Sequence, residues 1–354
     1  MVRSTGELWA WALLVAAGCG ASRHTVPAVD GGAECPAPPP GSVDLLLVMP
    51  NAYNHSDEQI HFAEGFALLL DVLSSGDVDG DGVADARPIS DLQVGVITSD
   101  LGDLWGEPVV SCASAAGGDD GRLVSDTDPT LVGCPDELPR FLSAVSGVDD
   151  MDAFVHDIAC LVRCGDDGCY PLQPLEAMLK ALTPSTSALR FADGTVGHGD
   201  GYNAGFLREE SRLAVLVMTK ADDCSASSSW ARDSWATICY EHAEHLHPVE
   251  RYVDGLRALR PGPCNRPLFL ALAGVPYDIQ DESYDAMLAD WRMMPEGDDP
   301  HSCDRPLARA PLRLVEVARG LEPAARVASI CTPEFEPAMR RFGAEILGVL
   351  FPVP

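Results

Sequence analysis

Short apolar runs alternate along this chain with longer segments in which apolar residues recur at helical spacing. Four runs are nearly unbroken, as is typical of strands buried on both faces of a parallel sheet: 43–49, 92–98, 213–218 and 267–275. A shorter strand is expected at 326–330. Helices are expected at 139–145, 151–161, 171–182, 249–259, 284–291, 312–320 and 334–350. This alternation predicts an α/β fold with a Rossmann-like, mostly parallel sheet, flanking helices and long disulfide-braced loops.

The first apolar run, 43–49, leads through a polar loop into an amphipathic helix. Only Asp44 interrupts the run, and Pro50 and Asn51 end it. Ser56 is a candidate helix cap, with Gln59 as its capping-box partner. Ligands of open α/β sheets bind at the carboxyl ends of the strands, so this loop is the first place to expect a site.

The charge balance is strongly acidic. The chain of 354 residues carries 24 basic and 54 acidic side chains, a net charge of −30. This excess argues against nucleic acid and anionic membrane surfaces as partners. General solubility remains an equally good reason for it. Neither a G-x-G-x-x-G register after a strand nor a P-loop is present, so no nucleotide is expected.

The first residues have the pattern of an export signal. Arg3 precedes an apolar block that is too short to span a bilayer, and small residues lead up to Cys19. We expect a lipoprotein signal peptide at 1–18, lipidation of Cys19, a Pro/Gly-rich tether at 19–42 and one domain at 43–354. The protein would then be anchored in a bacterial cell envelope, in the periplasm or at the cell surface. A soluble secretory signal is the alternative.

Twelve cysteines support an exported chain braced by disulfides. Eleven remain beyond Cys19, so at least one has no partner within the chain. Proximity in sequence suggests one bridge among Cys160, Cys164 and Cys169. It also suggests three others: Cys112–Cys134, Cys224–Cys239 and Cys303–Cys331. A zinc site in the 160–169 cluster is possible, but no second cysteine pair lies close by to complete it.

The segment 77–85 has the spacing of a calcium-binding loop. Aspartates stand at its first, third, fifth and ninth positions, a glycine at the sixth, and the seventh would offer a main-chain carbonyl. The predicted ligands are Asp77, Asp79, Asp81, Val83 and Asp85. Pro88 occupies the twelfth position, where such loops carry a bidentate glutamate. We expect a structural Ca²⁺; an acidic turn without metal is the alternative.

Residues 43–59, VDLLLVMPNAYNHSDEQ, resemble the first strand and helix of von Willebrand factor type A domains in a group of bacterial lipoproteins. SDLG at 99–102, GCYPLQPLEAMLKAL at 168–182 and TKADDCS at 219–225 are similar to further patches of that family. The resemblance implies a metal-ion-dependent adhesion site. The matching positions are Pro50, Ala52, Asn54 and Lys220. Because proline and alanine offer no side-chain oxygen and lysine repels a cation, the site is expected to be degenerate.

The resulting expectation is a non-enzymatic envelope protein that binds a protein or cell-surface ligand. A cation-dependent adhesin is one alternative, with Asn51, Asn54, Asp100 and Asp222 as substitute ligands. A metallohydrolase using His242, His245 and His247 is another, but their spacing matches neither H-E-x-x-H nor H-x-x-E-H.

Overall fold

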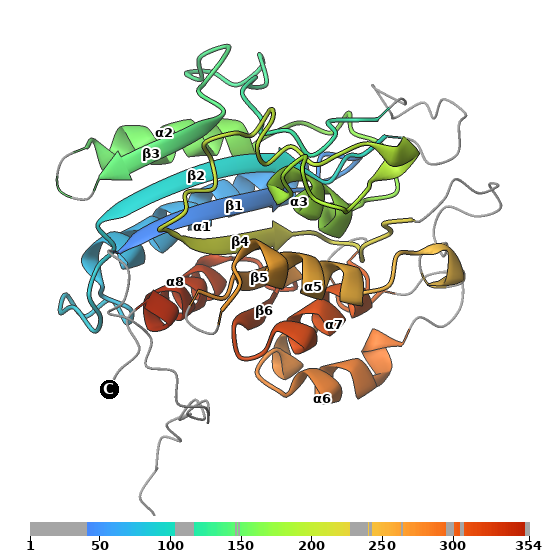
Figure 1. Ribbon diagram of the computed structural model, residues 1–354. Coiled ribbons are helices and arrows are strands. Elements are labelled where there is room, and N and C mark those ends of the chain that lie inside the picture. Colours follow the sequence, from blue (N-terminus) through green and yellow to red (C-terminus); the bar gives the residue numbers. More distant parts are fainter. Residues whose placement is uncertain are drawn as a thin grey trace, which may run out of the picture. The chain divides into compact units, whose positions relative to one another are not determined.

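Strand β1 (Ser42–Met49) lies inside a six-stranded sheet of the order β3-β2-β1-β4-β5-β6, seen in the computed structural model of Figure 1. It pairs in parallel with β2 (Asp91–Thr98) and β4 (Arg212–Met218). The sheet continues in parallel through β5 (Leu268–Ala273) and β6 (Ala325–Ser329), whereas β3 (Phe141–Val145) is antiparallel to β2. The structure describes residues 41–102, 117–145, 147, 149–226, 240, 243–262, 265–294, 301–304 and 308–350.

Helices cover both faces of this sheet (Figure 1). The described part of the chain contains α1 (Ser56–Ser75), α2 (Met151–Val162), α3 (Pro174–Leu182), α5 (Glu250–Leu259), α6 (Tyr284–Ala289), α7 (Leu312–Leu321) and α8 (Glu336–Leu350). Leu45 and Leu47 of β1 pack in one apolar core with α1, α2 and α8. Leu46 and Val48 pack in a second core with α3, α5, α6 and α7. Burial on both faces explains the unbroken apolar run of β1 and confirms the predicted α/β fold.

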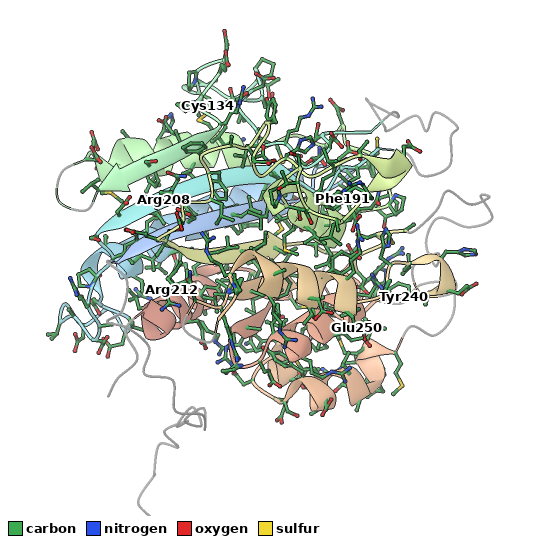
Figure 2. All side chains as sticks on the ribbon, viewed as in Figure 1. Cys134, Phe191, Arg208, Arg212, Tyr240 and Glu250 are labelled. Carbon is green, nitrogen blue, oxygen red and sulfur yellow. A yellow bond between two sulfur atoms is a disulfide. The ribbon has the colours of Figure 1, made fainter. Side chains whose placement is uncertain are left out.

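Asp44, the one charge in this run, is fully buried. Arg208 Nε and the Arg208 main-chain N–H donate to its carboxylate, both at 2.7 Å, and Ser211 Oγ adds a third hydrogen bond. The Arg208 side chain is labelled in Figure 2. Burial nevertheless raises the pKa of Asp44. These contacts satisfy the carboxylate, so a buried charge is compatible with an interior strand.

Two predicted local features are wrong. Residues 141–145 form edge strand β3 and not a helix, because Leu142 and Ala144 alternate inward against β2. The capping box is also absent: α1 has His55 at its N-cap without a side-chain cap. Gln59 instead turns back toward the loops before α1 and after α2.

The described cysteines correct part of the predicted disulfide pattern. Cys303 pairs with Cys331, as proximity suggested. Cys134 pairs with Cys160, so its predicted pairing with Cys112 is wrong. The predicted bridge inside the 160–169 cluster is wrong as well, because Cys160 is bonded to Cys134 and Cys164 is a free thiol. Cys224 is disulfide-bonded, while Cys19, Cys112 and Cys239 lie outside the described residues.

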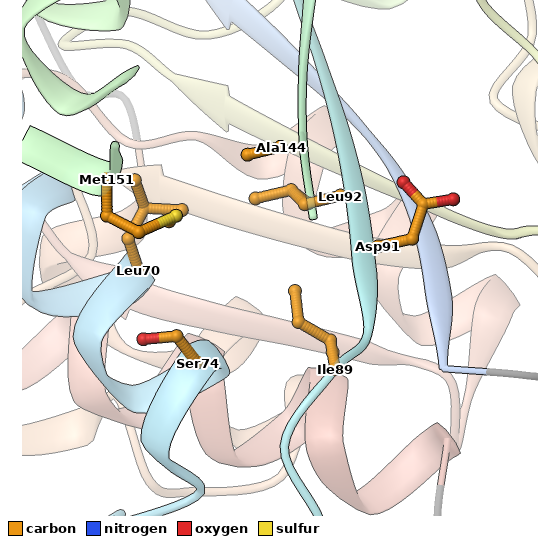
Figure 3. Close-up of a pocket in the computed structure, with 7 residues that line it drawn as sticks. All are labelled: Leu70, Ser74, Ile89, Asp91, Leu92, Ala144 and Met151. Carbon is orange, nitrogen blue, oxygen red and sulfur yellow. The ribbon is translucent and has the colours of Figure 1, made fainter. Parts of the chain in front are cut away.

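A small apolar pocket lies where the end of α1 meets the starts of β2 and α2 (Figure 3). Its cavity volume of about 10 Å³ accommodates about one water molecule. In Figure 3 the Asp91 carboxylate points away from the apolar side chains, and it pairs with Arg208. The pocket offers no polar side chain for a specific ligand apart from Ser74. Within the described residues, none of the helices combines the length and apolarity needed to cross a membrane.

Candidate functional site

The loop between β1 and α1 lies at the carboxyl edge of the sheet and is joined to the segment that precedes α3. Ala52 forms a parallel bridge with Gly168, and the Gly168 N–H donates to the Asn51 carbonyl at 2.8 Å. A Cβ atom on Gly168 would come within 2.3 Å of Asn51 Oδ1. Only glycine therefore permits this close approach of the two loops.

The buried side chain of Lys220 fixes the main chain of this loop. Lys220 lies two residues after the end of β4, and its ammonium donates to the main-chain carbonyl of Asn54. The same ammonium lies 2.9 Å from Glu58 Oε2, and both side chains are 5% exposed. Asn54 adopts a left-handed φ of 70°, so its carbonyl is fixed by an unusual main-chain conformation. Lys220, Asn54 and Glu58 are called the lysine lock below.

All three loop positions that are predicted to be degenerate, Pro50, Ala52 and Asn54, use main-chain carbonyls as hydrogen-bond acceptors. The donors are side chains of this same chain. The pairs are Gln59 Nε2 with the Pro50 carbonyl at 2.8 Å, His55 Nδ1 with the Ala52 carbonyl at 2.9 Å, and Lys220 Nζ with the Asn54 carbonyl. The loop is thus held in place by hydrogen bonds from within the protein.

His55 is the least accessible polar side chain of the loop, 4% exposed. Because its Nδ1 donates to the Ala52 carbonyl, its Nε2 carries a lone pair, and Nε2 has no hydrogen-bond partner among the described residues. Burial lowers the pKa of His55. Asp166 accepts from the His55 main-chain N–H at 3.2 Å and from Ser56 Oγ at 2.5 Å. These contacts tie the start of α1 to the 165–168 segment.

The two aspartates after Lys220 are buried and hold neighbouring main-chain groups. Asp222 accepts from the N–H groups of Arg313, at 3.1 Å, and Asp223, at 2.9 Å. Burial raises the pKa of Asp222 to about 7. Asp223 accepts from the Leu175 N–H at 3.0 Å and from Arg313 Nε at 3.1 Å. Asp222 therefore links the segment after β4 to α7, Asp223 links it to both α3 and α7, and both are used as structural acceptors.

Asp100 and Asp119 form a second acidic group at the end of β2. Asp100 Oδ1 accepts from the Gly102 N–H at 2.7 Å, which caps the turn there. Burial, together with the nearby Asp119 carboxylate, raises the pKa of Asp100 to about 6. Asp119 Oδ2 accepts from Asn51 Nδ2 at 2.9 Å and from Thr98 Oγ1 at 2.6 Å. Of the substitute ligands considered from sequence, Asp100 and Asp222 therefore accept main-chain N–H groups, and Asn51 donates to Asp119. The Asn54 carbonyl accepts from Lys220.

Sequence reasoning missed Glu58, Asp119 and Asp166, which complete these contacts. Glu58 stands in the first turn of α1, where an acidic residue ordinarily suits the helix dipole. Its partner, Lys220, lies 162 positions away in the chain, so no local sequence pattern predicts the pair. Asp119 and Asp166 lie in irregular segments, where their partners depend on the tertiary fold.

The predicted calcium loop brings three of its four aspartates together. Carboxylate oxygens of Asp77, Asp79 and Asp85 lie within 4.8 Å of one another, whereas Asp81 is not part of this group. Asp77 accepts from the N–H groups of Gly80 and Gly82 at 2.7 and 2.8 Å. The Gly82 hydrogen bond in particular lowers the pKa of Asp77. Converging carboxylates suit a hard divalent cation, which these residues could hold.

In the described part of the segment 242–247, the two histidines do not share a metal site. His245 Nε2 lies 3.9 Å from Glu244 Oε1, and His247 Nε2 lies 3.6 Å from Glu176 Oε1. Glu176 is already bound by both Nε and Nη2 of Arg251, at 2.9 and 2.8 Å. His242 lies outside the described residues.

Comparisons with known proteins do not assign this chain to a family. No protein-family model matches it, and no curated protein shows significant similarity to it.

Proposed function

We propose that this chain is a non-enzymatic binding protein whose von Willebrand factor type A-like domain presents the carboxyl edge of its sheet to a ligand without a metal ion there. The strand order and the position of the β1–α1 loop are compatible with such a domain. The patches quoted from the sequence supply the remaining support. The ligand would be a protein or another cell-surface molecule.

The lysine lock is the observation that carries the proposal. Lys220 occupies the position at which the resemblance would place a metal-binding aspartate, and its ammonium bonds to Asn54 and Glu58. A second positive charge beside this ammonium would be repelled. The fixed cation of the lysine would thus replace a bound ion and keep the loop in a single conformation.

The proposal assigns no catalytic step to this edge. The buried carboxylates of Asp100, Asp222 and Asp223 each accept main-chain N–H groups, which ties them to the scaffold. A general base needs a free acceptor within reach of a substrate proton. These aspartates are better suited to stabilising the loops.

A structural Ca²⁺ at Asp77, Asp79 and Asp85 is a second part of the proposal. The ion would join the end of α1 to the segment before β2, at the opposite end of α1 from Glu58 of the lysine lock. Arg340 Nη1 donates to the Val78 carbonyl at 3.4 Å, so the loop also rests on α8. We further propose export and lipidation at Cys19. A Cys19→Ala variant that stays in the membrane fraction with unchanged mature mass would contradict the lipid anchor.

Thermal unfolding of residues 20–354 with added Ca²⁺, Mg²⁺ or Mn²⁺ tests the metal assignments. We expect Ca²⁺ alone to raise the melting temperature, and Asp79→Asn/Asp85→Asn to remove the effect. Mg²⁺ and Mn²⁺ should leave the wild type unchanged. A rebuilt variant, Pro50→Asp/Ala52→Ser/Asn54→Ser/Lys220→Asp, should gain a response to Mg²⁺ or Mn²⁺. Stabilisation of the wild type by Mg²⁺ that survives in the Asp79→Asn/Asp85→Asn variant would overturn the metal-independent site.

A further inference from the structure

Tyr53 stands at the tip of the β1–α1 loop, between the bridged Ala52 and the locked Asn54. It is 74% exposed, although an aromatic ring of this size usually finds a place to pack. Asn54 and Asp57 beside it are exposed as well. A single exposed aromatic residue is ordinary at a protein surface, but Tyr53 differs in how its main chain is held and in the charges that stand near it.

The main chain on both sides of Tyr53 is fixed. Ala52 is bridged to Gly168 and accepts from His55 Nδ1, while the Asn54 carbonyl accepts from Lys220. A loop that is ordered before binding loses little conformational entropy when a partner docks. Exposed aromatic residues on rigid supports are the type that dominates binding energy at protein interfaces.

Three carboxylates stand on the segments that follow this loop or are bridged to it. Asp57 is exposed in the first turn of α1, and Asp167 is exposed next to the bridged Gly168. Asp166 is half-buried and accepts from the His55 N–H and Ser56 Oγ. The Lys220 side chain is 5% exposed and its ammonium is paired with Glu58, so it repels a cation inside the loop more than one at the exposed tip. The net charge of −30 on the whole chain adds to the attraction of these carboxylates for a cationic partner.

We propose that Tyr53, Asp57, Asp166 and Asp167 form a tip surface that binds an arginine-rich segment of a partner protein. A guanidinium group stacks on the Tyr53 ring, and its planar N–H groups pair with the neighbouring carboxylates. Arginine suits this surface better than lysine, because a compact ammonium cannot stack and pair at the same time. The inference rests on the proposed function and adds to it the class of partner.

Binding of fluorescently labelled, end-blocked oligo-arginine and oligo-lysine peptides of equal length tests the proposal, measured by anisotropy at about 0.15 M salt. The wild type should bind the arginine peptide more tightly. Tyr53→Ala should weaken this binding about two- to fivefold, which is the loss of affinity that corresponds to one exposed cation–π contact. Tyr53→Phe should retain the binding, because it keeps the aromatic ring. Tyr277→Ala is the matched control, since Tyr277 is 56% exposed on another loop.

Asp167→Asn should also weaken binding of the arginine peptide, whereas Asp254→Asn, with its side chain 77% exposed on α5, should not. The proposal is overturned if Tyr53→Ala and Tyr277→Ala give the same affinity, or if both peptides bind equally well. Such a result would not change what thermal unfolding with Ca²⁺, Mg²⁺ or Mn²⁺ says about the metal sites. In that case the metal-independent scaffold would stand and only the class of partner would be wrong.

Discussion

The ammonium of Lys220 lies 2.9 Å from the carboxylate of Glu58, with both side chains 5% exposed. The chain has only one other lysine, Lys180, and it too is buried and paired, with Asp120. Arginine supplies the remaining basic side chains. Both lysines therefore form buried ion pairs inside the protein. Lys220, at the carboxyl edge of the sheet, fixes the loop that the proposed function depends on.

Replacement of one partner of the Lys220–Glu58 pair should be costly. Glu58→Gln leaves a buried ammonium without its counter-charge, so we expect the free energy of unfolding to fall by about 3 kcal/mol. Urea denaturation measures this change. Asp285→Asn, which breaks the exposed pair with Arg319 at 3.0 Å, is the control and should cost under about 1 kcal/mol. Equal losses in the two variants would contradict the lysine lock.

Asp222 should make stability depend on pH. Its pKa is raised to about 7 in the folded protein, against about 3.9 in the unfolded chain, so the folded state binds its proton more tightly. Its stabilising contribution is therefore complete below about pH 4 and is lost as pH rises through about 7. Asp222→Asn removes this dependence. Relative to the variant, the wild type should lose up to about 1.4 kcal/mol for each pH unit in that window.

Denaturation of wild type and Asp222→Asn in parallel between about pH 4 and pH 8 checks the prediction, because other groups then cancel. Asp254→Asn is the exposed control. A wild type that gains stability over Asp222→Asn as pH rises would show that Arg313 and the N–H donors outweigh burial at this carboxylate.

The sequence predicted the sheet well, because strands buried on both faces leave unbroken apolar runs such as 43–49 and 213–218. It failed at β3, where five alternating residues are too few to separate a strand from a short helix. The degenerate metal site at Pro50, Ala52 and Lys220 stays a prediction, and the sequence did not predict the contacts that these residues make. Every residue type has a main-chain carbonyl, so these acceptors cannot be recognised from the sequence. Glu58 and Lys220 are brought together only by the tertiary fold.

The disulfide between Cys134 and Cys160 should stabilise the chain. The two residues are 26 positions apart, and a closed loop of that size contributes about 3 kcal/mol. Cys134→Ser/Cys160→Ser should lose about that amount, and Cys303→Ser/Cys331→Ser, with a separation of 28, should lose a similar amount. Peptide mapping of unreduced protein should recover a fragment that joins Cys134 to Cys160. A fragment that joins Cys112 to Cys134 would contradict the structure.

Gly168 should be intolerant of any side chain. A Cβ atom there would come within 2.3 Å of Asn51 Oδ1, and Asn51 is held in turn by Asp119. Gly168→Ala should therefore separate the two loops and cost about 1–3 kcal/mol, the usual penalty of overpacking. Gly201→Ala is the control, because the nearest atom to its Cβ would be 3.7 Å away.

The effect of Gly168→Ala on binding separates two roles for this contact. The variant releases the Ala52–Gly168 bridge beneath Tyr53, so affinity for the arginine peptide should fall even where the protein remains folded. Gly201→Ala should leave both stability and affinity unchanged. If Gly168→Ala lowers the melting temperature but not the affinity, the loop contact serves the fold alone, and Tyr53 binds without needing a fixed support.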